Sequence, residues 1–407
     1  MPQQKKTHTS GQQMQVKGFS AAAVRAGIKY QNRLDLGLIF SETPAAAAGV
    51  FTTSTVKAAP VLLGMERLRS GRAQAIVVNS GNANACTGAE GMSMARAVGG
   101  LAAQALRIDE ELVQVASTGV IGAQLKLEPF AKAMPDLAAA LSPDGFADLA
   151  RAIMTTDTVP KTAAATVMID NREVNLWACA KGAGMIMPNM ATMLCFAVTD
   201  AKIAQPALQA AVSSGAELSF NRITVDGDTS TNDTVLCLAN GAAGNTLLDQ
   251  HCPEALAVFT EALHGLFKDL AVQIVRDGEG ATKLVIIRVE GAATQEEAVN
   301  AARTIANSPL VKTAFFGEDA NWGRIIAALG RSGAEFQPER VAIAFDEALL
   351  VENGFGLGQE AEHAASQVLK KKDFTVTVRL GQGAAAAEVL TCDLSCDYVK
   401  INADYRS

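Results

Sequence analysis

The stretch Lys181-Gly-Ala-Gly-Met-Ile-Met-Pro-Asn-Met-Ala-Thr-Met-Leu194 lies near the middle of this chain of 407 residues. It is rich in glycine and methionine, and its Ala191-Thr192 pair opens an apolar run to Val198 that predicts a buried strand. A threonine hydroxyl is a weak nucleophile until a base removes its proton, and the free α-amine of the same threonine is such a base. The stretch therefore suggests that the chain cuts itself between Ala191 and Thr192.

Two interpretations of this stretch remain open on its residues alone. Glycine and methionine are also typical of a flexible loop with core-filling side chains. Three features favour self-cleavage instead. The glycines permit the distorted backbone that makes one peptide bond reactive, Ala191 gives its carbonyl little steric cover, and the Thr192 hydroxyl is placed for an N-to-O acyl shift.

Composition narrows the class of protein. With 49% hydrophobic and 19% charged residues, a chain of this length predicts two or three domains with a large core. A net charge of -7 argues against nucleic-acid binding, which needs clustered lysine and arginine. We find no apolar run of the ~18 residues that span a membrane, and residues 1–16 lack the apolar core of a signal peptide. We therefore expect a cytoplasmic protein that binds neither nucleic acid nor membrane.

The sequence does not favour a metal site. It contains seven cysteines and four histidines, and Cys392 and Cys396 form a C-x3-C pair without a second pair. Zinc sites usually need two such pairs or a cysteine pair with spaced histidines. We expect no metal and no bound cofactor.

Strand-like and helix-like segments alternate along the chain, which predicts mixed α/β layers. We place a domain boundary near residue 284, which gives a catalytic α/β domain of residues 1–283 and a smaller C-terminal α/β domain of residues 284–407. The strands expected from apolar runs are residues 73–78, 112–116, 163–169, 174–179, 283–289, 341–345, 374–379, 387–390 and 398–401. The helices expected from periodicity are residues 130–141, 146–154, 206–218, 253–276, 294–307 and 322–329.

Four further motifs carry polar chemistry. Ser117-Thr118-Gly119 follows a strand, so it is either a simple turn or a pair of donors aimed at an oxyanion. Residues 154–161 pack three hydroxyls, a carboxylate and an amine together, which suits an amino-acid head group or a helix stop before Pro160. Residues 221–233 lack the ligand order of a calcium site, and they fit better as a polar loop between two strands, packed near an active site. Glu279 lies between two glycines, where a carboxylate is free to meet a cationic ligand.

Together these motifs resemble the ornithine acetyltransferase family of arginine biosynthesis, also called glutamate N-acetyltransferase. The resemblance runs from Lys17 to Tyr405. It rests on several long motifs in the right order: residues 79–88, 117–122, 154–161, 181–194, 225–233, 276–282 and 316–323.

The resemblance implies a layered helix-sheet-sheet-helix core like that of the self-processing aminopeptidase relatives of N-terminal-nucleophile enzymes. It implies cleavage between Ala191 and Thr192 into an α chain (1–191) and a β chain (192–407) that stay together, typically as α2β2. It also implies a nucleophile, Thr192, and an oxyanion hole, Thr118 and Gly119. The implied substrate-binding residues are Thr155, Lys181, Thr192, Glu279, Asn402 and Ser407, with Thr156 and Thr158 left as alternatives to Thr155.

The implied reaction is a ping-pong transfer of acetyl from N-acetylornithine to glutamate through acetyl-Thr192, without metal or cofactor. Acetyl-CoA as a second acetyl donor is left open. Two alternatives compete with this function. One is a related N-terminal-nucleophile peptidase or amidase, which passes the acyl group to water. The other is an uncleaved amino-acid-binding regulator.

Overall fold

The computed structural model describes residues 6–8, 15–187 and 193–404. These residues divide into two compact units. The first comprises residues 1–221 and 228–274, and the second comprises residues 222–227 and 275–407. The domain boundary that the sequence predicts near residue 284 remains a prediction.

The described residues of the first unit form one hydrogen-bonded sheet of nine strands in the order β1-β6-β7-β8-β9-β3-β4-β5, with β2 paired to β3. Its strands are β1 (Lys6–His8), β2 (Phe19–Val24), β3 (Leu36–Phe51), β4 (Arg72–Asn79), β5 (Val113–Ser117), β6 (Lys161–Ile169), β7 (Arg172–Lys181), β8 (Leu194–Thr199) and β9 (Thr234–Ala239). Its helices are α1 (Ala59–Arg67), α2 (Gly88–Leu106), α3 (Glu128–Ala139), α4 (Phe146–Ala152), α5 (Gln205–Leu218) and α6 (Pro253–Arg276), whose last two residues belong to the second unit.

Strand β3 joins two layers of this sheet. Residues 36–41 pair with β2, residues 36–40, 45 and 46 pair with β4, and residues 46–51 pair with β9. The register with β4 shifts between Phe40 and Ala45, as at a β-bulge, which lets a strand bend out of one layer into the next. Side chains from both layers, such as Ile76 of β4 and Phe196 of β8, belong to one buried core. The two expected sheets are therefore the two layers of one continuous sheet that folds at β3.

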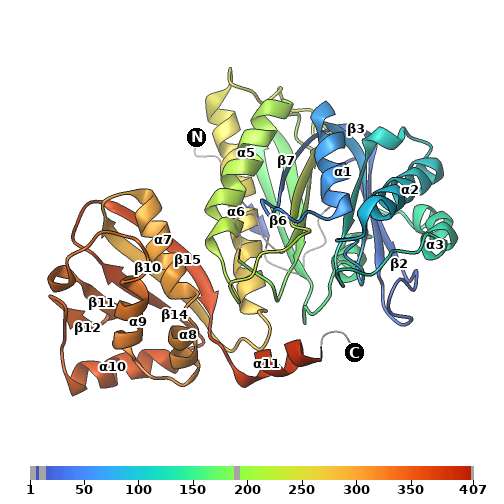
Figure 1. The fold of residues 1–407 in the computed structure, drawn as a ribbon. Coiled ribbons are helices and arrows are strands. Elements are labelled where there is room, and N and C mark those ends of the chain that lie inside the picture. The colour runs from blue at the N-terminus through green and yellow to red at the C-terminus, as the bar shows by residue number, and fades with distance from the viewer. Residues whose placement is uncertain (1–5, 9–14, 188–192, 405–407) are drawn as a thin grey trace. The chain divides into compact units, whose positions relative to one another are not determined.

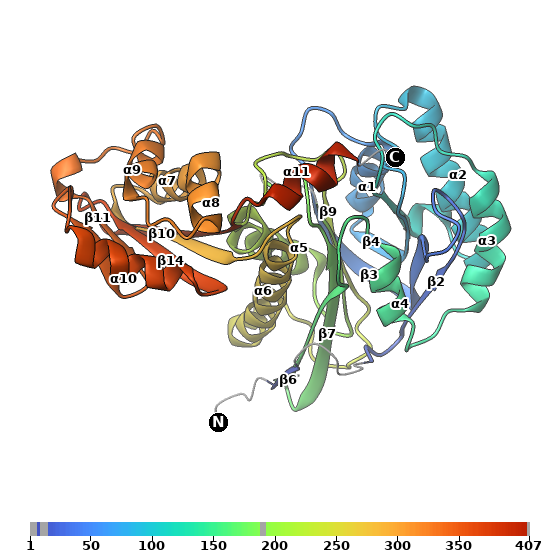
Figure 2. The ribbon, with the colours of Figure 1, turned by 90° about the horizontal axis from the view of Figure 1, so that it is seen from below.

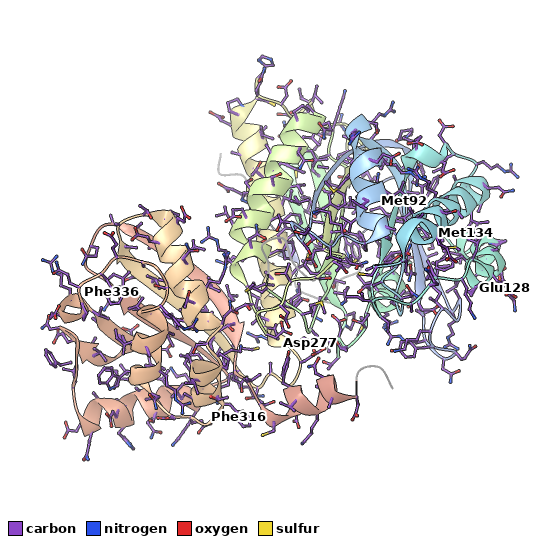
Figure 3. All side chains as sticks on the ribbon, in the orientation of Figure 1. Met92, Glu128, Met134, Asp277, Phe316 and Phe336 are labelled. Carbon is purple, nitrogen blue, oxygen red and sulfur yellow. The ribbon has the colours of Figure 1, made fainter. Side chains whose placement is uncertain are left out.

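Helices cover the outer faces of both layers, which confirms the predicted α/β layering. On one side α1, α2 and α3 pack on the β2–β5 layer, where Met134 is buried and Met92 packs against the same core (Figure 3). On the other side α5 packs on β3 and β9, and α6 lies beside it (Figure 1). Figure 2 shows the strands between these two sets of helices. Residues 75–78 of β4 form a buried apolar run because both faces of the strand are covered.

The second unit has a mixed sheet in the order β13-β12-β11-β14-β10-β15 among its described residues. The strands are β10 (Leu284–Ala292), β11 (Ala342–Phe345), β12 (Ala348–Glu352), β13 (Phe355–Gly356), β14 (Asp373–Arg379) and β15 (Ala385–Cys392). The helices are α7 (Gln295–Ala306), α8 (Pro309–Phe316), α9 (Trp322–Leu329), α10 (Gln359–Leu369) and α11 (Cys396–Ala403).

One predicted strand is wrong. Residues 398–401 lie inside helix α11. The Ser395 hydroxyl accepts a hydrogen bond from the Asp397 amide and so caps the helix, and Asp397 places a negative charge in its first turn. The β-favouring run Tyr398-Val399 misled the prediction, because Val399 is exposed and packs in no sheet. Of the helices in the described part of the chain, none combines the length and apolar character needed to cross a bilayer.

Candidate active site

The opening stretch lies between two neighbouring strands of the first unit. Strand β7 ends at Lys181, β8 begins at Leu194, and these two residues are paired. Leu194 is paired in turn with Thr234, the first residue of β9. The segment therefore leaves and rejoins the sheet at one edge, where β9 also begins. Ala191 and Thr192 lie outside the described residues, and Met193 is the first described residue after them.

A buried ion network surrounds the start of this stretch. Asp157 pairs with Lys161 at 2.7 Å, and both side chains are fully buried. Asp157 also accepts hydrogen bonds from the backbone N–H of Gly182 at 2.6 Å and of Thr155 at 3.0 Å. Burial by itself would raise the pKa of Asp157, but the charges of Lys181 and Lys161 and these hydrogen bonds outweigh it and lower that pKa to about 2. Asp157 thus ties the residues predicted at 155 and 181 into one cluster.

The backbone of Thr155 has a second anchor. The guanidinium of Arg33 donates hydrogen bonds to the carbonyls of Met154 and Thr155. Thr155 and Thr156 are partly exposed and Thr158 is exposed, so the choice among the three hydroxyls stays open. Sequence reasoning missed Arg33, since no local pattern links it to residues more than a hundred positions away.

The predicted oxyanion turn follows β5. Gly119 has a φ of +136°, and a Cβ built on it would lie 2.3 Å from the carbonyl carbon of Gly81. Only glycine fits there. The Thr118 amide donates to the Asn79 carbonyl at 3.0 Å, so the hydroxyl of Thr118 is the donor that this residue has left for a ligand.

Asn232 connects this turn to the polar loop before β9. Its side-chain amide donates to the carbonyls of Ala83 at 2.6 Å and Ser117 at 2.8 Å. Asn232 is buried, and its two bonds hold together the loops that follow β4 and β5. The sequence placed this loop near an active site but did not single out Asn232.

The next residue, Asp233, reaches the strand that follows the proposed nucleophile. Its Oδ1 accepts a hydrogen bond from the Met193 amide at 2.8 Å, and the Thr234 amide donates to the Met193 carbonyl at 3.1 Å. Burial raises the pKa of Asp233 well above its usual range, against the opposing effects of the Met193 amide and the charge of Lys181. No local sequence pattern predicts the hydrogen bond between Asp233 and Met193.

The remaining predicted substrate residues lie in the second unit, which is described by itself. Glu279 is buried and accepts a hydrogen bond from the Asn402 side-chain amide at 2.7 Å. The Ser395 hydroxyl donates to the Gly280 carbonyl at 2.6 Å and fixes the turn next to Glu279. Ser407 lies outside the described residues.

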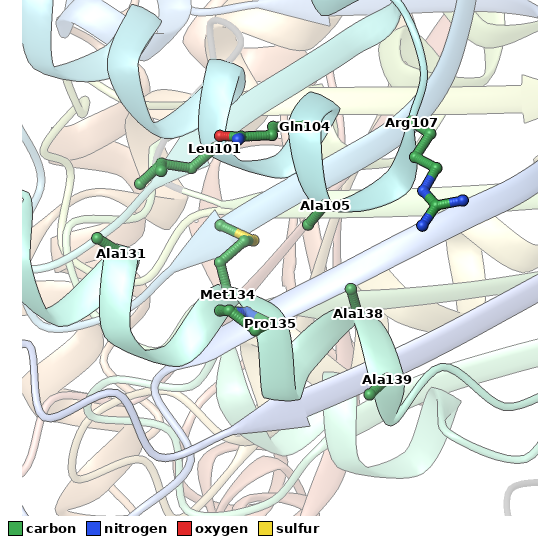
Figure 4. Close-up of a pocket in the computed structure, with 9 residues that line it drawn as sticks. All are labelled: Leu101, Gln104, Ala105, Arg107, Ala131, Met134, Pro135, Ala138 and Ala139. Carbon is green, nitrogen blue, oxygen red and sulfur yellow. The ribbon is translucent and has the colours of Figure 1, made fainter.

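A groove of about 630 Å³ lies elsewhere in the first unit, between α2 and α3 (Figure 4). This is a volume typical of small-molecule pockets. Its walls are alanines and aliphatic side chains with Arg107 and Gln104 at the edge, and they hold none of the predicted site residues. The groove is therefore separate from the site predicted from the sequence. Within the described residues, no group of three or more His, Cys, Asp or Glu side chains is arranged to hold a metal ion.

Comparisons with known proteins agree on one family. A family model described as "ArgJ family" matches residues 20–407. An arginine biosynthesis bifunctional protein ArgJ from Desulfotalea psychrophila is 55% identical over 394 residues, which cover 97% of this chain and 100% of the relative.

Two solved structures are also similar. The crystal structure of the arginine biosynthesis bifunctional protein ArgJ from Bacillus halodurans is 45% identical, covers 51% of this chain and 97% of its own, and has a TM-score of 0.49. That of an ornithine acetyltransferase from Mycobacterium tuberculosis, complexed with ornithine, is 37% identical, covers 46% of this chain and 99% of its own, and has a TM-score of 0.43. The family model and the 55% identity over nearly the whole of both chains show that this chain belongs to the ArgJ family.

Proposed function

We propose that this chain is a glutamate N-acetyltransferase of arginine biosynthesis, which moves the acetyl group of N-acetylornithine to glutamate through acetyl-Thr192. Its membership of the ArgJ family sets the pathway. One observation supports the site most directly. The Asp233 side chain accepts a hydrogen bond from the amide of Met193, the residue after Thr192. The side chain of its neighbour Asn232 donates a hydrogen bond to the Ser117 carbonyl, next to Thr118 and Gly119.

The first step of the proposal is self-cleavage of the chain, which generates the active enzyme. The Thr192 hydroxyl attacks the Ala191 carbonyl, the C–N bond to Thr192 breaks, and the acyl group moves to the hydroxyl oxygen as an ester. Water then hydrolyses the ester and leaves a carboxylate on Ala191 and a free α-amine on Thr192. This gives an α chain of residues 1–191 and a β chain of residues 192–407, for which α2β2 is the proposed assembly.

The second step is acetyl transfer. The α-amine of Thr192, with a reference pKa of about 7.7–8.0, takes the hydroxyl proton as the oxygen attacks the acetyl carbonyl of N-acetylornithine. The Thr118 hydroxyl and the Gly119 N–H stabilise the oxyanion, and the loss of one such donor typically costs about 3 kcal/mol of transition-state stabilisation. Ornithine leaves with a proton. The α-amine of glutamate then attacks the acetyl ester, the bond between the acetyl carbon and the Thr192 oxygen breaks, and that oxygen takes up the proton lost by the amine. N-acetylglutamate is released and the Thr192 hydroxyl is regenerated.

Two charged residues of the predicted set suit the charged groups of the substrates. Lysine is a cation that can pair with a carboxylate, and Lys181 begins the opening stretch. We assign Lys181 to the substrate α-carboxylate and Glu279 to a substrate amine. Thr155, Asn402 and Ser407 complete the proposed substrate-binding set.

Mass analysis under denaturing conditions tests the cleavage. Purified protein is expected to give two fragments, the second beginning with Thr192, and Thr192→Ala is expected to stay uncut and inactive. Thr192→Ser, which keeps the hydroxyl, is expected to be cut. A wild-type chain that remains whole at 42.4 kDa on incubation contradicts the proposal.

Product analysis tests the transfer. Formation of N-acetylglutamate from N-acetylornithine and glutamate supports it, whereas release of acetate instead identifies a hydrolase. A whole chain that binds amino acids without turnover identifies a regulator. An assay with acetyl-CoA and glutamate decides whether acetyl-CoA is a second donor. The cytoplasmic location remains a prediction.

A further inference from the structure

The turn that carries Glu279 is held in the second unit by a carboxylate that the proposed cycle does not use. Asp393 follows β15 and is almost inaccessible, at 2% exposure. Its Oδ1 accepts hydrogen bonds from the backbone N–H of Thr282 at 2.8 Å and of Lys283 at 3.0 Å. Its Oδ2 accepts one from the Thr282 hydroxyl at 2.5 Å. Thr282 and Lys283 come shortly after Glu279, so one side chain fixes the end of this turn.

Ser395 holds the middle of the same turn. Its hydroxyl donates a hydrogen bond to the Gly280 carbonyl at 2.6 Å and accepts one from the Asp397 amide at 3.2 Å, at the start of α11. A Cβ built on Gly280 would lie 2.6 Å from the Tyr398 nitrogen and 2.8 Å from Ser395 Oγ. The turn therefore packs directly on the first turn of α11.

Helix α11 in turn reaches the Glu279 carboxylate. Asp393 and Ser395 lie just before this helix, and Asn402 near its end donates a hydrogen bond to Glu279 Oε2 at 2.7 Å. The same amide of Asn402 donates to the Tyr398 carbonyl at 3.0 Å, which fixes its orientation on the helix. The carboxylate is thus held both through its own backbone turn and through the helix that is attached to that turn.

The segment that contains Asp393 is itself anchored to α8. The buried ammonium of Lys312 donates hydrogen bonds to the Thr391 hydroxyl at 2.9 Å and to the Cys392 carbonyl. On the other side of Asp393, the Leu394 amide donates to the Lys312 carbonyl at 3.2 Å. Because the residues on both sides of Asp393 are fixed, its carboxylate is a firm support for the turn.

We propose that Asp393 and Ser395 are positioning residues for substrate recognition: they hold the turn of Glu279 against α11 and so fix the Glu279 carboxylate where it meets the side-chain amine of N-acetylornithine. A charged hydrogen bond of this kind depends strongly on distance and angle. When the turn is released, the carboxylate has to be ordered at the moment of binding, which lowers the affinity. Glutamate has no side-chain amine, so its binding does not depend on this turn. The inference rests on the proposed function and adds two positioning residues to it.

The test compares Asp393→Ala with its conservative counterpart Asp393→Asn. Alanine removes the acceptor from the Thr282 and Lys283 donors, whereas asparagine keeps a carbonyl oxygen for the two backbone N–H groups. We expect Asp393→Ala to raise the KM for N-acetylornithine about 10-fold, while the KM for glutamate stays unchanged. Asp393→Asn is expected to restore most of the affinity for N-acetylornithine.

Asp346→Ala is the matched control. Asp346 is another carboxylate of the second unit that accepts a backbone N–H, that of Thr375 at 2.9 Å. Its loss is expected to change neither KM, because its hydrogen bonds are to Thr375 and Lys371 and not to the turn of Glu279.

A double variant separates positioning from a general loss of structure. Residues that act as one unit have non-additive effects, so Asp393→Ala is expected to raise the KM for N-acetylornithine by less than about 2-fold when Glu279→Gln is already present. Four outcomes overturn the inference: effects of the two substitutions that multiply, an unchanged KM for N-acetylornithine in Asp393→Ala, an equal rise in both KM values, or no gain in affinity from Asp393→Ala to Asp393→Asn.

The proposed function and this inference fail separately. A wild type that does not transfer acetyl overturns the proposed function, and an unchanged KM for N-acetylornithine in Glu279→Gln overturns the assignment of Glu279. If Glu279→Gln raises that KM and Asp393→Ala does not, this inference fails alone. Should Asp393→Ala not fold, Ser395→Ala decides. A rise in the KM for N-acetylornithine alone then supports the proposal, and an unchanged KM contradicts it.

Discussion

Gly119 packs its α-carbon directly on the backbone of Gly81, so that a Cβ on Gly119 would lie 2.3 Å from the Gly81 carbonyl carbon and 2.7 Å from its oxygen. Gly119→Ala therefore has to push the turn after β5 away from the loop after β4. We expect the displaced oxyanion donors to lower kcat about 100-fold, measured as N-acetylglutamate formation by the cut enzyme.

Gly122→Ala is the matched control for this substitution. Gly122 has a positive φ of +85° like Gly119, but a Cβ on it meets nothing within 4 Å. We expect it to cost about 1 kcal/mol of unfolding free energy through backbone strain and to keep kcat. An active Gly119→Ala enzyme would show that the turn does not hold the oxyanion.

Asn232→Ala removes the amide that joins the loops after β4 and β5. Two buried carbonyls, those of Ala83 and Ser117, then lose their donor. At about 1–3 kcal/mol for each unsatisfied group, we expect a loss of a few kcal/mol in urea unfolding together with a lower kcat. Asn240→Ala, which removes an exposed amide bonded to the Lys17 carbonyl, is expected to leave kcat unchanged. A fall in stability without a fall in kcat would show that Asn232 stabilises the fold but does not position the oxyanion turn.

The sequence predicted the layered α/β class and most helices, because their apolar periodicity is local. It did not predict β3, whose Ala45–Ala48 run lacks the alternation and β-branched residues of a typical strand. That run is a strand because both layers of the sheet pack around it. The same limit explains the strand predicted at residues 398–401, where a capping serine outweighs the β-favouring side chains.

The residues of the candidate site also fall into those that local sequence predicts and those that it does not. Thr118, Gly119 and Lys181 belong to short motifs, so a few adjacent residues are enough to predict them. Asn232 and Arg33 act through hydrogen bonds to segments between 115 and 149 positions away, so no local pattern reveals them. Such residues are found only when the fold brings the segments together.

Asp157 gives the chain a distinct response to acid. Its pKa falls from 3.8 to about 2 on folding, so its stabilising effect is complete above pH 3.8 and is lost as the pH falls toward 2. Asp35, Asp200 and Asp233 have raised pKa values and change in the opposite direction, so total stability alone does not isolate Asp157. We expect the difference in unfolding free energy between wild type and Asp157→Asn to shrink between pH 4 and pH 2, measured by urea unfolding at each pH.

At pH 7 the same substitution leaves Lys161 and Lys181 without their buried carboxylate. Breaking a buried ion pair on one side typically costs about 3–5 kcal/mol, and we expect a loss of that order. Asp148→Asn, which breaks the exposed pair with Arg151, is the control and is expected to change the unfolding free energy by less than about 1 kcal/mol. A pH-independent difference between wild type and Asp157→Asn would show that the carboxyl is not ionised in the folded chain.

Glu279 offers a test of substrate recognition. The α-nitrogen of N-acetylornithine carries the acetyl group, so the side-chain amine is the only cationic group of this substrate. Glu279→Gln removes the carboxylate that we propose binds this amine. We expect the KM for N-acetylornithine to rise about 10-fold or more, while the KM for glutamate, whose side chain is an anion, does not rise. Asn402→Ala, which releases the carboxylate from its 2.7 Å hydrogen bond, is expected to raise the same KM by less. Glu388→Gln, in an exposed ion pair with Arg288 of the same unit, is the control. Equal changes in both KM values would assign Glu279 to the shape of the turn and not to the amine.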